Sequence, residues 1–391
     1  MAVNLTNADS ALKSAYLDAI TTQLNNHVNP FFAAIEKSTS NVTGKEVRKL
    51  CIHGMNGGVG AGTEDGALPS ATGNNYTEFV SPLKNLYGVI EISDKALRAS
   101  ENDSGALINL LNAEMDGLIQ SSIYNFGRML FGDGSGVLGE VVGYSGKDVI
   151  VNGPRNFIEG MYVDFRDTNG NIVFSGKRIK SVYQPQNIVI FEGENLTEDI
   201  VPTGSLITVQ GSYNNEITGL GALFNKDKKT IYGLDKEDNY WLQPLDQNFG
   251  GGEIDETILQ MYMDEIEMQS GKPINLFLCS MGVKRALYKM LSKDRKIFDT
   301  VEIAGGYKTL SYNGIPIVAD RFCPRGTLYM LNTNDFALHQ LCDWQWLADE
   351  DGKILRQVPG KPVYTATLVK YADLICTNPC GQGIIRNLAE A

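Results

Sequence analysis

A glycine-rich segment near the start of the chain restricts its fold more than any other feature. Seven glycines fall in the twenty residues from Gly54 to Gly73, with few apolar side chains among them, so the segment cannot bury a core of its own. Strand-like runs flank it at 46–52 and 86–92. A two-stranded ribbon is only marginally stable alone in water, and loops of this length in compact proteins usually have a function. We therefore expect residues 45–92 to form a two-stranded arm that packs on a neighbouring chain.

The composition is that of a soluble protein with more than one domain. Its 391 residues suffice for two or three cores, and no stretch approaches the roughly 20 consecutive apolar residues of a membrane helix. The N-terminus lacks the basic and apolar regions of a secretory signal, and six scattered cysteines are too few for a disulfide framework. These features predict a protein made in a cytoplasm, with reduced thiols and no membrane contact.

The net charge of −12 argues against a nucleic-acid-binding protein, because neutralising phosphates requires clustered lysines and arginines. Two short basic clusters, at 226–229 and 293–296, are each interrupted by an aspartate. We expect both to be solvated loops or helix ends.

The N-terminal residues 1–44 begin with apolar positions at helical spacing between Ala11 and Leu24. Phe31 and Phe32 follow in an otherwise polar stretch. Two interpretations of this pair stay open: it packs in the core of its own chain, or it docks onto another subunit.

The longest helical pattern runs from Ser104 to Phe131, with one broad apolar stripe and a closing Gly132. Such a helix is about 40 Å long and can serve as a spine. Residues 137–217 then change to short alternating strands, with a tight-turn signal at Asn169-Gly170, and predict a small all-β barrel or sandwich.

A mixed α/β region follows from about 235 to 345. Asp255 can cap a helix that ends at Gly271, residues 273–279 form a buried-strand run, and Ser280 can cap the next helix. Extended patterning returns at 363–369. The whole chain is therefore predicted to be α+β.

No motif indicates catalysis, a cofactor or a metal. The three histidines lie far apart in the sequence. Ser280 sits at a strand-to-helix junction, but position 278, where a nucleophile elbow needs glycine, is leucine. The glycine-rich segment has no lysine after Gly62 to serve as a phosphate-binding loop. We predict that the chain is not an enzyme and has no catalytic, cofactor-binding or metal-binding residues.

Three stretches of sequence carry a resemblance to a known family. Residues 314–317 read Gly-Ile-Pro-Ile, residues 323–326 read Cys-Pro-Arg-Gly, and residues 329–332 read Tyr-Met-Leu-Asn. With the order of arm, long ribbon, spine helix and α/β domain, they resemble the major capsid proteins of tailed bacteriophages with the Hong-Kong-97-like fold. The Gly219-Leu220 junction is similar to one in the same family.

The resemblance implies a division of the chain into named parts. They are an N-terminal arm at 1–44, an E-loop at 45–92, a P-domain with the spine helix at 93–136, an inserted β domain at 137–217, a return to the P-domain at 218–234, an A-domain at 235–352, and P-domain strands with the C-terminus at 353–391.

The implied function is structural. Many copies would form hexamers and pentamers of an icosahedral shell that encloses double-stranded DNA without reading its sequence, assembled in the bacterial host cytoplasm and found in the virion. A separate scaffolding protein, a portal and decoration proteins are the implied partners. Candidate subunit-interface residues are Phe31, Phe32 and, as intersubunit ion pairs along the arm, Arg48, Lys49, Glu64, Asp65 and Lys84.

Two alternatives remain at the level of sequence. One is an encapsulin-like nanocompartment shell, which shares the fold and lacks DNA. The other is a two-domain enzyme that uses the β domain at 137–217 as a binding module.

Overall fold

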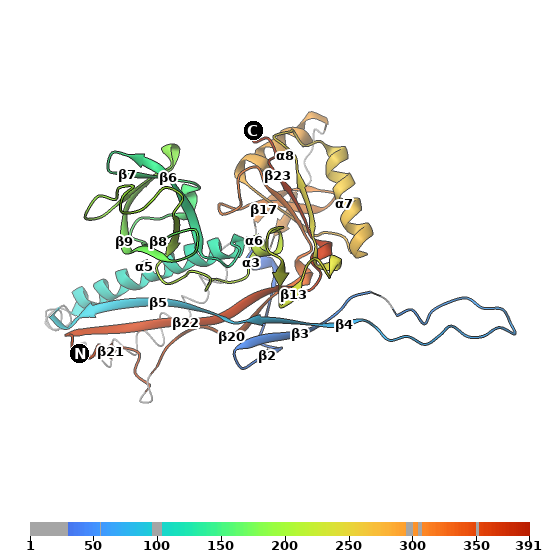
Figure 1. Ribbon diagram of the computed structural model, residues 1–391, viewed down its shortest axis with the longest axis horizontal. Helices are drawn as coiled ribbons and strands as arrows, with labels where there is room; N and C mark the ends of the chain where they lie inside the picture. Colours follow the sequence, from blue (N-terminus) through green and yellow to red (C-terminus); the bar gives the residue numbers. More distant parts are fainter. Residues whose placement is uncertain (1–29, 55, 96–103, 295–299, 304–306, 349–351) are drawn as a thin grey trace.

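The computed structural model describes residues 30–54, 56–95, 104–294, 300–303, 307–348 and 352–391. The helix expected between Ala11 and Leu24 lies outside these residues, so it stays a prediction. Figure 1 shows a long, narrow sheet with two bulkier units on the same side of it and an arm that extends far beyond both.

The long sheet is built around β22, whose fourteen residues span about 46 Å. β22 pairs antiparallel with β20 on one side and with β5 on the other, and β1 and β21 complete the sheet. The strands are β1 (Glu36–Ser38), β5 (Lys84–Ser93), β20 (Phe336–Trp346), β21 (Arg356–Gln357) and β22 (Val363–Cys376).

The helix α5 (Ser104–Phe131) lies along this sheet, as its predicted role as a spine requires (Figure 1). Every second residue of β5 is buried beneath it, including Leu86, Ile90 and Ile92. Gly88 lets the helix approach closely, because a Cβ there would lie 2.8 Å from the side chain of Leu118. The bounds of this helix are those predicted from the sequence.

Phe31 and Phe32 belong to the core between α5 and the long sheet. They lie in the short helix α3 (Pro30–Ala34) and are 0% and 1% exposed. Phe31 meets the ring of Phe336 edge-on at 5.3 Å, and Phe32 meets Phe126 in the same way at 5.0 Å. The interpretation as an intersubunit contact is therefore wrong for this pair, because neither ring has surface left for another chain.

Six strands between α5 and residue 211 close into a barrel in the order β10-β7-β6-β11-β8-β9. They are β6 (Val137–Ser145), β7 (Asp148–Val151), β8 (Tyr162–Arg166), β9 (Ile172–Tyr183), β10 (Ile188–Phe191) and β11 (Leu206–Val209). The tight turn predicted at Asn169-Gly170 joins β8 to β9, with Gly170 at φ +87°. Inward side chains such as Val141, Val163 and Phe165 are fully buried and form the core of the barrel.

The α/β unit contains a seven-stranded sheet in the order β14-β23-β19-β15-β18-β17-β16. Its strands are β14 (Leu245–Asn248), β15 (Leu276–Cys279), β16 (Thr300–Ile303), β17 (Tyr307–Tyr312), β18 (Ile315–Ala319), β19 (Leu328–Leu331) and β23 (Gly383–Arg386). The helices α7 (Glu256–Ser270) and α8 (Met281–Asp294) cover one face. The other face packs on the end of α5, where Tyr329 contacts Phe131, and on α6 (Leu220–Leu223).

The helix signals in this unit are confirmed. The Asp255 carboxylate accepts a hydrogen bond from the backbone N–H of Ile258, and Gly271 ends α7 at φ +67°. The Ser280 hydroxyl accepts from the backbone N–H of Val283 at 3.3 Å and so caps α8.

The sheet topology differs from the predicted division at two places. β20, expected in the α/β region that ends near residue 352, pairs with β22 in the long sheet. β23, expected among the late P-domain strands, lies between β14 and β19 inside the α/β sheet. The chain therefore crosses between the two units more often than a linear division into domains implies.

The arm consists of β2 (Val42–Thr43), β3 (Glu46–Ile52) and β4 (Tyr76–Pro82) with the connecting loop. The predicted pairing of residues 46–52 with 86–92 is wrong: β3 pairs with β4, and residues 86–92 belong to β5 of the long sheet. None of the described helices combines the length and the apolarity that crossing a membrane requires.

Candidate assembly surface

The base of the arm is fixed to the body by a stack of aromatic rings. Trp241 lies parallel to His53 of the arm at 4.6 Å and to Phe79 of β4 at 5.6 Å, and Phe79 also stacks on Tyr232 at 5.1 Å. Trp241 lies in η4 (Tyr240–Leu242), and Tyr232 lies in the turn between β12 (Thr230–Ile231) and β13 (Leu234–Asp235). Aromatic pairs in such geometry add stability beyond their buried area. The anchored part of the arm therefore ends near His53 and Tyr76.

A buried carboxylate fixes the same region from the other side. Asp373 of β22 is fully buried and accepts hydrogen bonds from the Ser81 hydroxyl at 2.5 Å, the Thr218 backbone N–H at 2.7 Å and the Thr218 hydroxyl at 3.1 Å. Burial raises the pKa of this carboxyl, and the three hydrogen bonds oppose that shift. One side chain thus joins β4, the long sheet and the segment that leaves the barrel.

The outward face of the arm carries exposed apolar side chains at its outer end, next to the ion-paired Arg48. Leu50, Ile52 and Tyr76 are 63%, 59% and 56% exposed, and Ile52 lies directly opposite Tyr76 across the ladder. The opposite face is buried through Val47 and Phe79. A strand pair needs only one buried face to be anchored, and the described part of the chain leaves these three apolar side chains exposed. We refer to Leu50, Ile52 and Tyr76 as the outward arm face.

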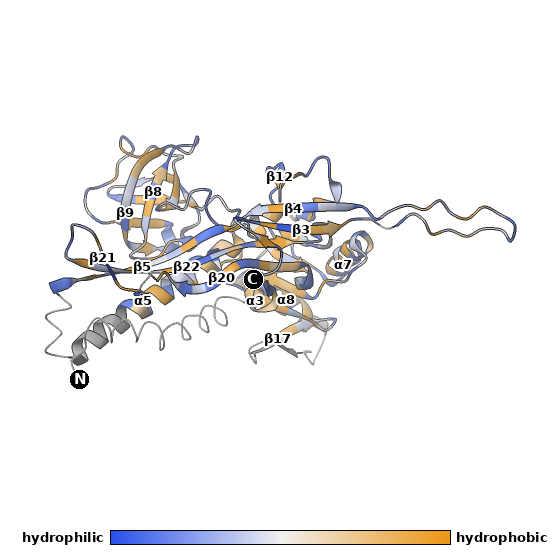
Figure 2. Ribbon diagram, turned by 90° about the horizontal axis from the view of Figure 1, so that it is seen from below, coloured by the Kyte–Doolittle hydropathy of each residue, from blue (hydrophilic) through white to orange (hydrophobic). Residues whose placement is uncertain are grey.

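Beyond His53 the arm extends as a long loop that stands clear of the rest of the molecule in both views (Figures 1 and 2). Val59 and Leu68 on this loop are 88% and 90% exposed. Its described internal contacts are few: Asn56 accepts hydrogen bonds from the Gly58 backbone N–H and the Thr72 hydroxyl. Two large apolar side chains on a loop without a core are suited to contact another molecule.

The five charged residues proposed as intersubunit ion pairs lie in different settings. Arg48 is already paired within the chain, to Glu46 at 2.7 Å and Glu78 at 3.3 Å. Lys84 donates to the backbone carbonyl oxygen of Asn214 at 3.1 Å, next to the barrel. Lys49 is half-buried, and Glu64 and Asp65 are exposed at the far end of the loop. Only Glu64 and Asp65 stand where a partner could approach from all sides, and their pairing stays a prediction.

A groove of about 1140 Å³ lies between β5, α5 and the barrel. Its lining includes Tyr87 and Val89 of β5, Ser121 and Asn125 of α5, and Tyr162 of the barrel. β5 pairs only with β22 in the described part of the chain, so its second edge opens into this groove. An unpaired strand edge is a template for pairing with another chain.

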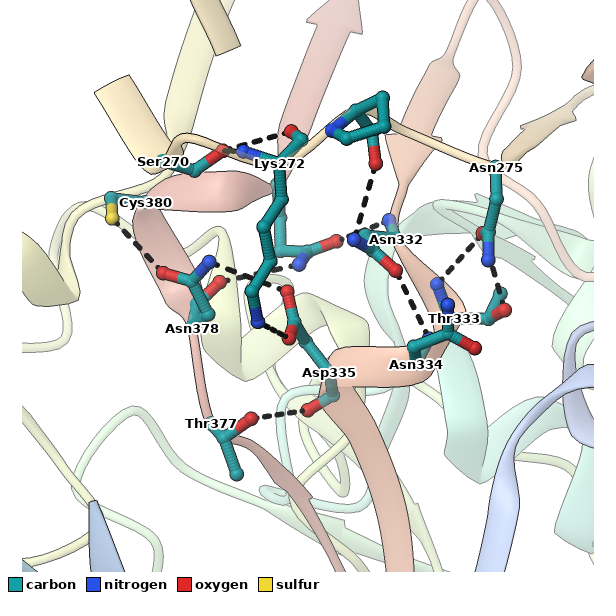
Figure 3. A network of polar contacts seen from close by, with 12 residues as sticks. Ser270, Lys272, Asn275, Asn332, Thr333, Asn334, Asp335, Thr377, Asn378 and Cys380 are labelled. Atoms are coloured by element: carbon teal, nitrogen blue, oxygen red, sulfur yellow. Dashed lines mark hydrogen bonds and ion pairs between the residues drawn. The ribbon is translucent and has the colours of Figure 1, made fainter. Parts of the chain in front are cut away.

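A polar network holds the long sheet against the α/β unit at the point where the chain crosses between them (Figure 3). Asp335 is 4% exposed and lies in η5 (Thr333–Asp335); it accepts from Lys272 at 2.6 Å and from Asn378 at 3.3 Å. Its backbone carbonyl oxygen accepts from Thr377 at 2.8 Å. Gln382, also buried, accepts from the Asn332 backbone N–H at 2.9 Å. Breaking such a satisfied buried network is costly, so the crossing is rigid.

Sequence reasoning missed this network, because its members come from three separate segments and match no motif. The one available signal was the density of asparagines at 332, 334 and 378, which favour turns. The same holds for the buried pair that ties the barrel to the spine helix: Arg128 donates to both carboxylate oxygens of Glu216, at 2.9 and 2.5 Å.

The described residues offer little for catalysis. No group of three side chains able to bind a metal comes together among them. Ser280 donates to the Glu390 carboxylate at 2.6 Å and serves as the cap of α8. The six cysteines are all described and unpaired, and burial raises the pKa of Cys279 to about 12, which keeps that thiol protonated and unreactive.

Comparison with solved structures identifies the fold. The structure is similar to a chain of the cyanophage A-1(L) capsid asymmetric unit, with a TM-score of 0.52 and 12% identity over 95% of this chain and 93% of that one. The chain has the fold of a phage capsid protein. The resemblance seen in the sequence is thereby confirmed at the level of the fold. No protein-family model and no curated protein matches the sequence.

Two further solved structures with a capsid or shell fold are more distant. The capsid of an empty GTA particle has a TM-score of 0.47 and 10% identity, over 93% of this chain and 90% of that one. The SrpI encapsulin complex of Synechococcus elongatus PCC 7942 has a TM-score of 0.45 and 10% identity, over 93% and 89%. The assignment of the capsid fold depends on the cyanophage capsid.

Proposed function

We propose that this chain is the major capsid protein of a tailed bacteriophage and assembles into the hexamers and pentamers of an icosahedral shell around double-stranded DNA. The observation that carries the proposal is the projecting arm, which has an exposed apolar outward face on a chain with a capsid fold. In a single copy the apolar side chains of this arm stay exposed to water, whereas a closed assembly can bury them between copies.

In the Hong-Kong-97-like plan, β3, β4 and their loop correspond to the E-loop. α5 and the long sheet correspond to the P-domain, the seven-stranded sheet with α7 and α8 to the A-domain, and the barrel to an inserted domain. The topology supports this assignment with two changes: β20 joins the P-domain and β23 joins the A-domain.

The arm of one copy is expected to lie in the groove of the next. The groove offers an open strand edge on β5, and the arm loop offers extended backbone with few internal hydrogen bonds. Contact between unlike surfaces of identical chains generates a ring when the rotation closes, as a hexamer or pentamer requires. Scaffolding, portal and decoration proteins, and assembly in the host cytoplasm, complete the proposal.

The proposal is tested by expressing the chain alone and together with the genes that flank it, and by examining the products by negative-stain electron microscopy. Closed shells or hexameric sheets support a capsid role. A uniform population of small oligomers under both conditions would contradict it. Nuclease-protected double-stranded DNA inside particles from infected cells supports the phage, whereas DNA-free shells with protein cargo would favour an encapsulin-like compartment.

A matched pair of variants tests the arm. The variant Leu50→Ser, Ile52→Thr, Tyr76→Ser removes the outward arm face and is expected to abolish shells while the chain stays folded, because these side chains are exposed. The control variant Ile172→Thr, Val173→Thr, Tyr183→Ser removes comparably exposed apolar side chains from the barrel and is expected to assemble. If both variants assembled equally well, the outward arm face would not be needed for assembly.

A further inference from the structure

A small cavity beside α6 is lined by the basic cluster at 226–229 and by one further lysine. It has a volume of about 250 Å³ and is lined by four lysines, Lys226, Lys228, Lys229 and Lys236, together with polar groups such as Gln243. The sequence alone predicts that residues 226–229 form a solvated loop or a helix end. The structure adds the buried Lys236 and places all four around one cavity.

Two of these lysines are held in position by backbone carbonyl groups. Lys236 is 7% exposed, and its Nζ donates to the carbonyl oxygens of Ala222, Leu223 and Asn225 at 3.3, 3.1 and 2.9 Å. Lys228 donates to the carbonyl oxygen of Asp133 at 3.2 Å, just beyond the end of α5. Carbonyl groups near helix C-termini attract cations but carry only partial charge. They orient the two ammonium groups without neutralising them.

Two carboxylates, Asp246 and Glu237, also line the cavity and pair with its outer lysines. Asp246 lies 3.2 Å from Arg386 and 3.9 Å from Lys226, and Glu237 lies 3.8 Å from Lys229. Among the described residues, neither Lys228 nor Lys236 forms an ion pair with a carboxylate. The cavity therefore keeps a net positive charge in a chain whose total charge is −12.

The titration of Lys236 is consistent with this charge balance. Burial, followed by the nearby charge of Lys228, lowers the pKa of Lys236 to about 8. A lysine is shifted in this direction when desolvation and like charge outweigh any anionic partner. An anion in the cavity would offset both the desolvation of Lys236 and its repulsion from Lys228.

We propose that this cavity binds a phosphate group. Lysine ammonium groups bind phosphate as point charges, and the ammonium groups of Lys226 and Lys229, on exposed side chains, can close over an anion beside Lys228. Lys236 contributes its charge alone, because carbonyl oxygens already accept from its three N–H donors. The phosphate can belong to a nucleic-acid backbone or be free in solution. The site goes beyond the proposed shell function and does not depend on it.

The test uses the purified full-length chain in calorimetric titrations with inorganic pyrophosphate and with a short DNA duplex of mixed sequence. The variant Lys226→Gln, Lys228→Gln is expected to weaken binding by roughly ten- to hundred-fold, the effect of losing one or two charged contacts. The matched control Lys284→Gln, Lys289→Gln changes the total charge equally, on α8, and is expected to bind like the unchanged chain.

Each outcome decides the proposal. Binding of both ligands, with competition between them, supports a nucleic-acid phosphate site; binding of pyrophosphate alone supports a site for a small anion. Absence of binding by the unchanged chain, or equal loss in variant and control, overturns the proposal. Because Lys228 supports the end of α5, Lys226→Gln alone serves as a second variant, since that side chain is exposed and its loss leaves the fold intact. Shell formation is measured separately, so the absence of phosphate binding would not contradict the proposed shell function.

Discussion

At the scale of single residues, Asp320 shows how burial controls a titration. It follows β18 and is 4% exposed, and its carboxylate accepts from the Phe322 backbone N–H at 2.8 Å. Burial raises its pKa to about 6, against the opposing effects of this hydrogen bond and of Arg321 and Arg155. The folded chain therefore holds a proton up to a higher pH than the unfolded chain does.

This shift predicts a pH dependence of stability. The contribution of Asp320 to the free energy of unfolding is largest below the pKa of the unfolded chain and is lost as the pH rises through about 6. Asp320→Asn keeps the hydrogen bond acceptor and removes the charge, so it should stabilise the chain at pH 7.5 by up to roughly 3 kcal/mol and have little effect at about pH 3, below the pKa of the unfolded chain. Urea unfolding of the two proteins at both pH values measures this difference. A gain independent of pH would show that the titration of Asp320 is not responsible.

Gly219 carries a second prediction at this scale. A Cβ at this position would lie 2.4 Å from the backbone oxygen of Met129 and 2.6 Å from that of Leu130. Backbone atoms at the end of a helix cannot move aside cheaply, so Gly219→Ala should destabilise the chain by about 2–4 kcal/mol. Gly143→Ala is the control, because a Cβ there meets nothing within 4 Å. Similar melting temperatures for the two variants would contradict this packing.

At the scale of elements, the sequence predicted the bounds of the helices, because apolar spacing and capping residues set these bounds locally. The bounds of α5 follow from its apolar stripe, and α7 begins and ends at the Asp255 and Gly271 caps. The partner of β3 was predicted wrongly, because alternation shows that residues 86–92 form a strand but not which strand they pair with. Their partner, β22, lies more than 270 residues later in the chain. The hydrogen bonds around Asp335 could not be predicted either, because they also join segments that lie far apart in the sequence.

The barrel provides a prediction at the scale of elements. Its two connections to the body lie side by side, since the Asn214 backbone N–H donates to the Ser135 carbonyl oxygen at 2.8 Å, and its core is filled by its own strands. Residues 134–215 should therefore fold alone, as domains of this size can. Circular dichroism and a cooperative thermal transition of the isolated segment measure this; a segment without a transition would show that the barrel depends on Arg128 and the rest of the body.

At the scale of the whole molecule, we expect the arm loop to be needed for assembly but not for folding. Deleting residues 57–72 joins Asn56 to Gly73, an Asn-Gly pair suited to a tight turn, and the Thr72 hydroxyl already contacts Asn56. The removed residues are nearly all exposed, so the free energy of unfolding should change by less than about 1 kcal/mol. Assembly, followed by sedimentation, should be lost. Normal shells from the shortened chain would show that the loop beyond Asn56 makes no essential contact.

The length of β22 has a mechanical consequence for the molecule. Ten successive residues of β22 face ten of β5, and β20 flanks the other side. A pull along this axis would slide the strands past each other and load their hydrogen bonds all at once, instead of opening them one by one. In a shell built from such subunits, internal pressure would therefore separate neighbouring copies at their contacts before it broke the long sheet within a copy.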